Sequence, residues 1–506
     1  MSNNYYIHTA TTARRIDSCA IETLHIPSLV LMEHAAWECA RFIQDHIPKN
    51  DSVFVLAGPG NNGGDGLAIA RLLQHSNQKV VCYCPKISSM SEDEKKQFEA
   101  IKALKIPYTH TVEKAISWMQ SSDCIVDALF GNGLTRSIEG NYKKLVEACN
   151  ASKSLVFSID IPSGLDATFG HILGTAMKAD YTISLDCYKI GQWICDGRDI
   201  CGKLTCADIG IPSLLHENAL DPILLLNEDC IRSIFPKRPT TGHKGTFGKG
   251  LMIGGSQCMH GAISMAANAC YHSGIGTLTL MIPDCIADCI AYKYDFAMLW
   301  RMPSKNGIFD RSSAYFLKKK LQNFSQISIG NGMQKTSSTE ALVECVLTSD
   351  LPVLVDADAI WAVGKHKEWL QRDACTILTP HIKEMSDLTG EEISTILEDP
   401  FHCVQSFCEQ YPNCVLVLKS NQTYIGYQHK LFVYDHPNSA LAKGGSGDVL
   451  CGILFGLLSQ CHSPLEAALC AVYVHSLAAD SKIDPAFFQP NHIIENLNFI
   501  FKKLRN

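Results

Sequence analysis

The sequence predicts a two-domain protein of the α/β class. Its 506 residues exceed what one hydrophobic core usually holds, so at least two domains are expected. Short apolar segments alternate with longer helical segments in both halves, a pattern typical of a parallel sheet covered by helices on both faces. Each half also contains a glycine-rich loop directly before a helix, where free backbone N–H groups can bind an anion.

The first half predicts a Rossmann-like α/β/α sandwich. Residues 13–47 are expected to be helical, because apolar residues recur at helical spacing in LMEHAAWECARFI. A second helix is expected to start near Asp65 and to continue through LAIARLLQH. The expected strands are residues 52–56, 79–84, 124–129, 155–161 and 181–185.

The segment 204–229 separates the two halves, because it contains Pro212 and Pro222 and lacks clear periodicity. The predicted domains are therefore residues 1–215 and 228–506. In the second domain a new series of strands is expected at residues 250–254, 277–282, 327–329, 353–356, 376–378, 415–418 and 424–425.

Composition excludes several classes of protein. The chain has 44 Lys and Arg against 51 Asp and Glu, so it lacks the basic surplus expected of a nucleic-acid-binding protein. Its longest apolar run near the C-terminus, residues 449–458, is too short to span a bilayer and predicts a buried helix. The sequence starts MSNNYYIHTATTARR, with no apolar stretch after a basic segment, so no signal peptide is expected. The 23 cysteines are therefore expected to be reduced thiols in a cytoplasmic protein.

The first glycine-rich loop has the sequence GPGNNGGDG, residues 58–66. It fits the GxGxxG pattern of dinucleotide-binding folds, but an ordinary Rossmann dehydrogenase also needs an acid at the end of the second strand. Tyr83, Cys84 and Pro85 occupy that place. The loop suits a phosphate group at a helix N-terminus, and the alternative is a tight turn without a ligand.

Polar residues follow three later strands of the first half. Asp127 precedes the loop FGNG, and Asp160 and Ser163 lie in DIPSGLD. Because the carboxyl ends of parallel strands meet at one crevice, these side chains are expected to converge there and could hold a hard monovalent cation. Lys189 follows another strand; it is either a further site residue or an ordinary surface lysine.

Together, GPGNNGGDG, DALFGNG, DIPSGLDA and YKIG resemble the NAD(P)H-hydrate epimerase domain over residues 1–215. The resemblance implies interconversion of the R and S hydrates of NADH and NADPH, with K⁺ bound by Asn62, Asp127 and Ser163. It also implies that Asp127 and Lys189 serve as acid and base, in an order that remains open. The implied substrate-binding residues are Asn61, Asn62, Gly63, Gly64, Asp65, Gly131, Asn132, Gly133 and Asp160.

The second glycine-rich loop, residues 444–448 with the sequence GGSGD, precedes the apolar helix VLCGILFGLL. Backbone N–H groups at such a helix start form an anion hole. Asp448 is placed to accept a proton from a hydroxyl that attacks a phosphoryl group. The alternative is an acidic residue that only complements the helix dipole.

The loop and four companion motifs resemble the ribokinase-like ADP- or ATP-dependent NAD(P)H-hydrate dehydratases over residues 228–506. The companions are KGTFG (244–248), DADA (356–359), TPHIKE (379–384) and LKSNQT (418–423). This chain reads GNGMQ at 330–334 where the family has GPGLG, and Trp361 replaces an Asn. The resemblance implies that a nucleotide phosphorylates the S hydrate, that phosphate leaves, and that Asp448 is the base.

The dehydratase resemblance also assigns ligands. Adenine nucleotide (ADP or ATP), Mg²⁺ and K⁺ are the implied cofactors. The implied substrate contacts are Ala262, Gly332, His381 and Asp448. The implied nucleotide contacts are Lys419, Ser420, Asn421, Gln422, Thr423, Gly444, Gly445 and Gly447.

The leading hypothesis is thus a fused epimerase and dehydratase that acts on small molecules, with no nucleic-acid or membrane partner and with assembly into a homo-oligomer. One alternative is a ribokinase-class small-molecule kinase. Another treats the first domain as a non-catalytic scaffold, and the presence of Asn62, Asp127, Asp160 and Lys189 argues against it.

Overall fold

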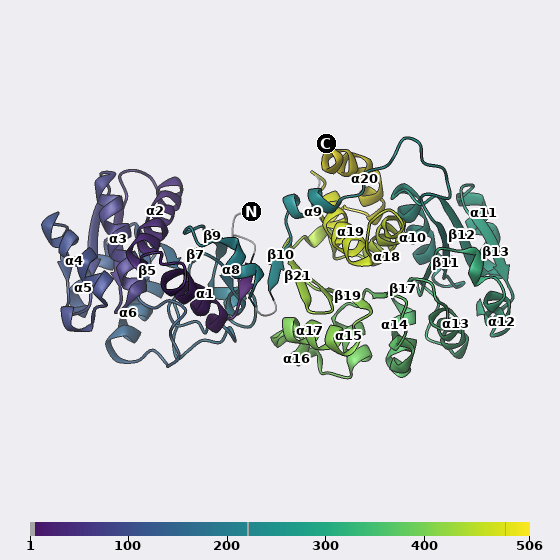
Figure 1. Ribbon diagram of the computed structural model, residues 1–506, viewed down its shortest axis with the longest axis horizontal. Helices are drawn as coiled ribbons and strands as arrows, with labels where there is room; N and C mark the ends of the chain where they lie inside the picture. Colours follow the sequence, from purple (N-terminus) through teal and green to yellow (C-terminus); the bar gives the residue numbers. More distant parts are fainter. Residues whose placement is uncertain (1–5, 220–221, 481) are drawn as a thin grey trace. The chain divides into compact units, whose positions relative to one another are not determined.

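The computed structural model describes residues 6–219, 222–480 and 482–506. The chain separates into two compact units, Met1–Ile223 and Leu224–Asn506. Each unit contains its own sheet with helices packed against it (Figure 1). The α/β class predicted from the alternating pattern is therefore confirmed in both halves.

The first unit is built on a seven-stranded sheet in the order β4-β3-β2-β5-β6-β7-β9. All of its neighbouring strands pair in parallel. Outside this sheet, β1 pairs in parallel with β8. The strands are β1 (Tyr6–His8), β2 (Ser52–Ala57), β3 (Lys79–Tyr83), β4 (Tyr108–Thr109), β5 (Cys124–Ala128), β6 (Leu155–Ile159), β7 (Tyr181–Leu185), β8 (Tyr188–Lys189) and β9 (Lys203–Ala207).

Apolar faces of the helices and of this sheet form the buried clusters of the first unit. The helices are α1 (Ala10–Glu22), α2 (Ser28–His46), α3 (Asn61–His75), α4 (Glu92–Ala103), α5 (Val112–Gln120), α6 (Gly140–Asn150), α7 (Gly197–Ile200) and α8 (Ser213–Glu217), with short 3₁₀ turns at Ile87–Ser89 and Ile190–Gln192.

Two helix boundaries differ from the sequence-based expectation. The helical segment expected over residues 13–47 consists of two helices, α1 and α2, because Pro27 cannot continue a helix and the preceding turn holds His25 at a φ of 57°. Helix α3 begins at Asn61, four residues before the expected start near Asp65. Most glycines of the first loop therefore lie inside the helix, and in the run 58–66 only Gly60 has a positive φ, of 105°.

The second unit has a parallel sheet in the order β13-β12-β11-β16-β17-β18-β19, continued by antiparallel β20 and β21. A two-stranded hairpin, β14 with β15, stands apart. The strands are β10 (Ile223–Leu225), β11 (Lys249–Ile253), β12 (Thr277–Pro283), β13 (Met298–Met302), β14 (Ser304–Lys305), β15 (Ile308–Phe309), β16 (Gln326–Ile329), β17 (Val353–Val355), β18 (Thr376–Leu378), β19 (Cys414–Lys419), β20 (Thr423–Tyr427) and β21 (Lys430–Tyr434).

Helices surround this second sheet as well (Figure 1). They are α9 (Glu228–Ile234), α10 (His260–His272), α11 (Asp284–Lys293), α12 (Ser312–Lys318), α13 (Ser337–Leu347), α14 (Asp358–Lys365), α15 (Ile382–Thr389), α16 (Ile393–Glu398), α17 (Pro400–Gln410), α18 (Ser446–Leu458), α19 (Pro464–Ala479) and α20 (Pro490–Arg505). The 3₁₀ turns are Leu321–Asn323, Lys367–Leu370 and Ser439–Leu441.

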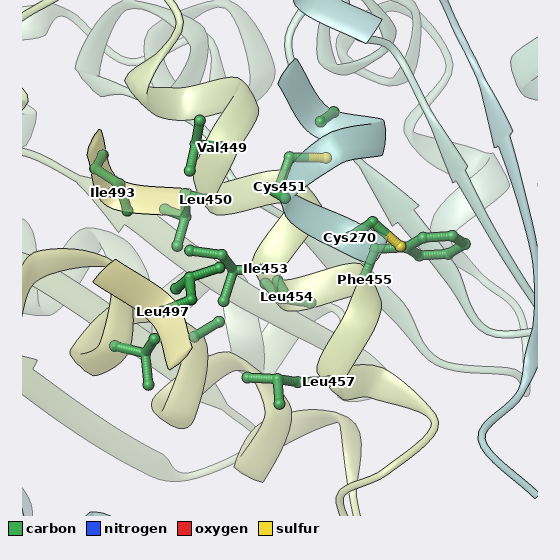
Figure 2. Close-up of a cluster of buried hydrophobic side chains, with 14 of the residues drawn as sticks. Cys270, Val449, Leu450, Cys451, Ile453, Leu454, Phe455, Leu457, Ile493 and Leu497 are labelled. Carbon is green, nitrogen blue, oxygen red and sulfur yellow. The ribbon is translucent and has the colours of Figure 1, made fainter. Parts of the chain in front are cut away.

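Helix α18 is the centre of the core of the second unit (Figure 2). Its residues from Val449 to Leu458 are buried, as the apolar run predicted. Gly452 lets α18 approach α10 closely, because a Cβ atom there would lie 2.2 Å from the Ala266 carbonyl oxygen. This contact fixes the position of the N-terminus of α18, which carries Asp448.

Two further expectations concern the state of the thiols and the presence of membrane-spanning helices. All 23 cysteines lie among the described residues as free thiols, and most of them are buried. Among the described residues no helix combines the length and the apolar character needed to cross a bilayer.

Candidate functional site

A cleft of about 690 Å³ lies at the carboxyl ends of the strands in the first unit. Residues from the first glycine-rich loop, from the loop after β5 and from the segment after β7 line it. Of the substrate-binding residues predicted from sequence, the cleft wall contains Asn61, Asn62, Asp65, Gly131, Asn132, Gly133 and Asp160. The structure therefore brings together most of one predicted site, although its members are far apart in the chain.

Lys189 is a buried member of the cleft wall and not a surface lysine, since only 1% of it is exposed. Its ammonium forms an ion pair with Asp160 and donates to the carbonyl oxygens of Leu185 (2.9 Å) and Cys187 (2.8 Å). Burial alone would lower the pKa of Lys189, but the charge of Asp160, its hydrogen bond and the nearby Cys187 together outweigh burial and raise the pKa above its usual value. The group is thus a charged, oriented donor in the resting site.

Asp160 sits where β6 ends, with a φ of 68° that few non-glycine residues adopt. Its second carboxylate oxygen accepts a hydrogen bond from the Asn132 amide at 3.1 Å. Strain of this kind persists where surrounding contacts hold it, often at functional sites. Asp160 thereby links Lys189 to the loop after β5.

Asp127, at the end of β5, is completely buried and does not belong to the cleft wall. Its carboxylate accepts from the Ser158 hydroxyl (2.8 Å), from the Ser163 hydroxyl (2.6 Å) and amide (2.9 Å), and from the Leu129 amide (3.3 Å). Burial raises the pKa of Asp127, and these hydrogen bonds oppose the rise. The geometry favours a fixed carboxylate behind the cleft wall over a mobile proton carrier.

The side-chain amide of Asn62 is one of the buried polar groups of the first unit that lack a partner among the described residues. Its oxygen and nitrogen are both buried, and neither forms a hydrogen bond with any described residue. Gly131 approaches it so closely that a Cβ there would lie 3.3 Å from the Asn62 Cγ. A buried amide of this kind needs a ligand, and its oxygen suits a hard cation.

Gly63 and Gly64 are closely packed at the start of α3, and their substrate contact stays a prediction. Both lie within the first turn of α3, and neither has a positive φ. A Cβ on Gly63 would lie 1.8 Å from the Gly58 carbonyl oxygen, and one on Gly64 would lie 2.6 Å from the Met32 Cε. They permit close packing of the helix start, and neither is among the residues that line the cleft.

Asp17 on α1 is a cleft residue that sequence reasoning did not select, because no motif surrounds it. Burial raises its pKa to about 7, and the neighbouring charges of Asp186 and Asp160 act in the same direction, whereas Lys189 opposes them. A carboxyl group that titrates near neutrality in a cleft is suited to proton transfer.

In the second unit, Asp448 lies in the first turn of α18 at the centre of a hydrogen-bonded cluster. The Asn331 side-chain amide donates to Asp448 Oδ1 at 2.7 Å and to Asp356 Oδ2 at 3.0 Å. Asp356 Oδ1 accepts from the Thr379 hydroxyl (2.7 Å) and from the Lys419 ammonium (3.2 Å). Burial raises the pKa of Asp448 to about 6; the charge of Asp356 adds to the rise and the Asn331 hydrogen bond opposes it.

The Lys419 ammonium, at the end of β19, lies beside the second glycine-rich loop at the start of α18. Gly445 has a φ of 96°, and a Cβ on Gly447 would lie 3.5 Å from the Lys419 Nζ. His475 lies behind the loop, with Nε2 3.0 Å from the Ser446 carbonyl oxygen, and burial lowers its pKa to about 4. A helix N-terminus with an adjacent ammonium group provides positive potential for a phosphoryl group.

The other residues predicted for the second site are the substrate contacts Ala262, Gly332 and His381 and the nucleotide segment from Lys419 to Thr423. Ala262 and Gly332 are neighbours, because a Cβ on Gly332 would lie 3.1 Å from the Ala262 Cβ. His381 precedes α15, where its Nδ1 accepts the Glu384 amide at 3.2 Å, and it pairs with Lys419 in an isolated β-bridge. The segment from Lys419 to Thr423 forms the turn between β19 and β20.

Two family models match the chain. One, described as "YjeF-related protein N-terminus", matches residues 28–191, and the other, described as NAD(P)H-hydrate dehydratase, matches residues 250–498. A ribokinase-like superfamily protein from Enterococcus faecalis has a similar structure, with 25% identity, a TM-score of 0.50, and coverage of 56% of this chain and 97% of its own. The ribokinase-like fold predicted for one half is thus confirmed.

Curated relatives are similar over nearly the whole chain. The bifunctional NAD(P)H-hydrate repair enzyme Nnr of Moorella thermoacetica is 31% identical over 94% of this chain and 92% of its own length. The enzyme of the same name from Coxiella burnetii is 31% identical over 92% of this chain and 93% of its own length. With both halves matched in order, the chain belongs to the family of bifunctional NAD(P)H-hydrate repair enzymes.

Proposed function

We propose that this chain repairs hydrated NADH and NADPH in two steps. The first unit interconverts the R and S epimers at the hydrated ring carbon, and the second dehydrates the S epimer at the expense of an adenine nucleotide. The observation that carries the proposal is the cluster of Asp448, Asn331, Asp356 and Lys419 at the glycine-rich start of α18, in a chain that also has the Lys189 cleft. The alternative, a small-molecule kinase, would assign no function to that cleft.

In the second unit, the hydroxyl oxygen of the substrate attacks the terminal phosphorus of the nucleotide, and Asp448 accepts the proton of that hydroxyl. The oxygen–phosphorus bond forms while the bond to the departing nucleotide breaks. The carbon–oxygen bond then breaks, inorganic phosphate leaves, and loss of a proton from the adjacent ring carbon restores the double bond. A pKa near 6 keeps Asp448 mostly ionised at neutral pH, as a base requires.

The transferring phosphoryl group carries negative charge that the chain must stabilise. Backbone N–H groups from Gly444 to Gly447 and the Lys419 ammonium supply that stabilisation. The turn from Ser420 to Thr423 lies directly after Lys419 and is proposed to hold the adenine nucleotide. Ala262, Gly332 and His381 are proposed to contact the hydrated nicotinamide nucleotide.

In the first unit, epimerisation needs one group that gives a proton to the leaving hydroxyl and another that accepts a proton when water returns from the opposite face. Lys189 and Asp160 line the cleft as a preformed pair and are proposed for this exchange, with Asp17 as a further proton carrier. Asp127, predicted as one of the two proton-transfer residues, is better suited to binding a cation because its carboxylate lies behind the cleft wall.

The residues proposed for K⁺ fit that ion chemically. The partnerless amide oxygen of Asn62, the carboxylate of Asp127 and the hydroxyl of Ser163 are hard oxygen donors on neighbouring loops. When bound, K⁺ supplies positive charge that helps to hold the substrate phosphates. Mg²⁺ is proposed to accompany the nucleotide; Asp356 and Asp358, whose charges both raise the pKa of Asp448, provide carboxylates of the type it prefers.

Several finer statements stay predictions. Domain limits at residues 1–215 and 228–506, assembly as a homo-oligomer and a cytoplasmic location all follow from the sequence and the resemblance alone. The choice between ADP and ATP as the phosphoryl donor is decided by the experiment that follows.

The test is to incubate the purified protein with mixed epimers of hydrated NADH, Mg²⁺ and K⁺, with ADP or ATP in parallel, and to follow the return of the reduced-nicotinamide absorbance. We expect complete recovery with one of the two nucleotides. Asp448→Asn is expected to slow recovery about 10²–10⁴-fold, the usual contribution of a general base. Recovery of one epimer only would restrict the function to the second unit, and no recovery with either nucleotide would contradict the proposal.

A further inference from the structure

Beneath the cleft of the first unit, three residues of metal-binding type lie together and have no part in the proposed repair reaction. One ligand atom each from Asp186, Cys187 and His216 lies within 4.8 Å of the other two. All three residues are buried, and His216 is completely inaccessible. Asp186 and Cys187 follow β7, whereas His216 comes from α8, about 30 residues further along the chain.

The imidazole of His216 provides an independent indication of a ligand. Its Nε2 atom is buried and forms no hydrogen bond with a described residue, although Asp186 Oδ2 lies only 3.1 Å away. The two atoms are close but poorly aligned for a direct hydrogen bond. A buried nitrogen beside a carboxylate oxygen in this arrangement is well served by a cation that both can bind.

The other ring nitrogen of His216 is already held in place. Its Nδ1 lies 3.2 Å from the Nε2 of His8 on β1, and the two rings stack at a centroid distance of 5.3 Å. Metal-ligating histidines usually donate their second N–H to such a partner, which fixes the ring orientation and the tautomer. With Nδ1 protonated toward His8, the Nε2 lone pair faces Asp186.

From this geometry we infer that the first unit binds one Zn²⁺ ion through Asp186, the Cys187 thiolate and His216. Thiolate, imidazole and carboxylate together are the donor set that Zn²⁺ accepts, and Mg²⁺ or Ca²⁺ does not compete well for sulfur and nitrogen. A carboxylate and a thiolate balance the ion's two positive charges, so the assembled site is neutral. The nearby Lys189 charge is balanced separately by Asp160.

The proposed ion has one consequence for the fold and one for the cleft. The ion ties α8 and, through His8, β1 to the end of β7. Because Asp186 and Cys187 also line the cleft, the fourth coordination position of a tetrahedral ion can be taken by water or by a substrate group from the cleft side. The zinc site is distinct from the K⁺ residues proposed above and does not depend on the repair activity.

The test uses the full-length protein with its three exposed cysteines, Cys258, Cys285 and Cys289, replaced by Ser to remove adventitious thiol sites. After chelation and dialysis, Zn²⁺ is added back and the bound metal is measured by mass spectrometry. Co²⁺ is titrated in parallel, because a thiolate ligand gives it a charge-transfer absorption band. We expect one equivalent of metal per chain, the Co²⁺ band and a higher Tm with Zn²⁺.

Cys187→Ala and His216→Ala are expected to abolish stoichiometric binding and the Zn²⁺-dependent rise in Tm. His8→Ala is expected to weaken binding about 10–100-fold, as loss of an orienting partner does. Cys201→Ala, a change at another buried thiol of the unit, is the matched control and should bind normally. Absence of the Co²⁺ band when the three ligands are intact, or binding that survives both ligand substitutions, would overturn the inference; the first measurement changes only the three exposed cysteines and no buried residue.

Discussion

At the scale of single residues, the position of Asn331 determines the chemistry of the second site. One amide group holds two carboxylates, Asp356 and Asp448, while its own oxygen accepts the Cys451 thiol at 3.2 Å. All the polar atoms of this buried side chain are therefore used. Such a residue orients Asp448 and stabilises its charged form, and so acts as a positioning residue for the base.

The pH dependence of dehydration should report Asp448 directly. Because burial and Asp356 raise the pKa of Asp448 to about 6, the carboxylate is ionised above that pH and protonated below it. A protonated Asp448 cannot accept the substrate proton, so kcat/KM should fall as pH decreases through about 6 and be level above it. A profile measured with saturating nucleotide checks this; a flat profile down to pH 4 would exclude Asp448 as the base.

Replacement of Asn331 should shift to higher pH the acid limb of the profile, which is the fall in kcat/KM at low pH. In Asn331→Ala the hydrogen bond that lowers the pKa of Asp448 is lost, so the pKa rises and activity falls off at higher pH. A hydrogen bond to a charged group contributes about 1.5–3 kcal/mol and one pKa unit corresponds to about 1.4 kcal/mol, so a shift of about one to two units is expected.

The matched control for that shift is Asn413→Ala, which removes a side-chain amide that donates to the Arg372 carbonyl oxygen away from the cluster. This variant should keep the acid limb of the unsubstituted protein. An Asn331→Ala profile that is lower in amplitude but unmoved along the pH axis would show that Asn331 only supports the fold.

Sequence motifs predicted the positions of the reactive residues better than the contacts that those residues make. GGSGD placed Asp448 at a helix start, and the structure has it in the first turn of α18. Lys419 was expected only as part of a nucleotide-binding segment, yet its ammonium contacts Asp356, because the ends of β17, β18 and β19 lie side by side in the sheet. Contacts of this kind join residues 63 positions apart and leave no local pattern.

At the scale of elements, the start of α3 depends on glycine for packing. In Gly63→Ala the added Cβ would lie 1.8 Å from the Gly58 carbonyl oxygen, so the helix start must shift. Overpacking of this kind costs about 1–3 kcal/mol, and the first unit should lose stability and epimerase activity together. Calorimetry of the full-length protein should show a lower transition temperature for the first unit.

Gly133→Ala is the matched control on stability, because a Cβ there meets nothing within 4 Å. Its transition temperature should equal that of the unsubstituted protein. Equal stability of Gly63→Ala would show that the loop can move aside and that the close approach of Gly58 to the helix is not required.

Element boundaries also show the limits of sequence reasoning. Alternation of apolar and helical segments was sufficient to predict both parallel sheets, since that periodicity records burial on both faces. The helical segment expected over residues 13–47 is interrupted between α1 and α2, because apolar spacing records burial of a helix face and not the break before Pro27. The early start of α3 was missed because glycines disfavour helix interiors unless packing demands them, and only the fold shows that demand.

At the scale of the whole molecule, the chain combines two compact units, each with its own sheet and its own candidate site. The first site is built on residues between 13 and 209, and the second on residues between 262 and 448. Neither cluster borrows a residue from the other unit. The two reactions should therefore be separable by substitution, with the hydrated nucleotide as the only shared component.

This separation predicts complementation between two proteins that each lack one of the two reactions. Lys189→Gln removes the charged donor of the first site while keeping a group that can hydrogen-bond to Asp160, and Asp448→Asn removes the base of the second. Alone, Lys189→Gln should recover only the S epimer and Asp448→Asn should recover neither. An equimolar mixture, with folding of each variant verified by circular dichroism, should recover both epimers, because the epimerised hydrate is a small molecule that can diffuse from one chain to another. A mixture that recovers only the S epimer would mean that the hydrate must pass between sites of one chain without release, and the independence of the two reactions would be disproved.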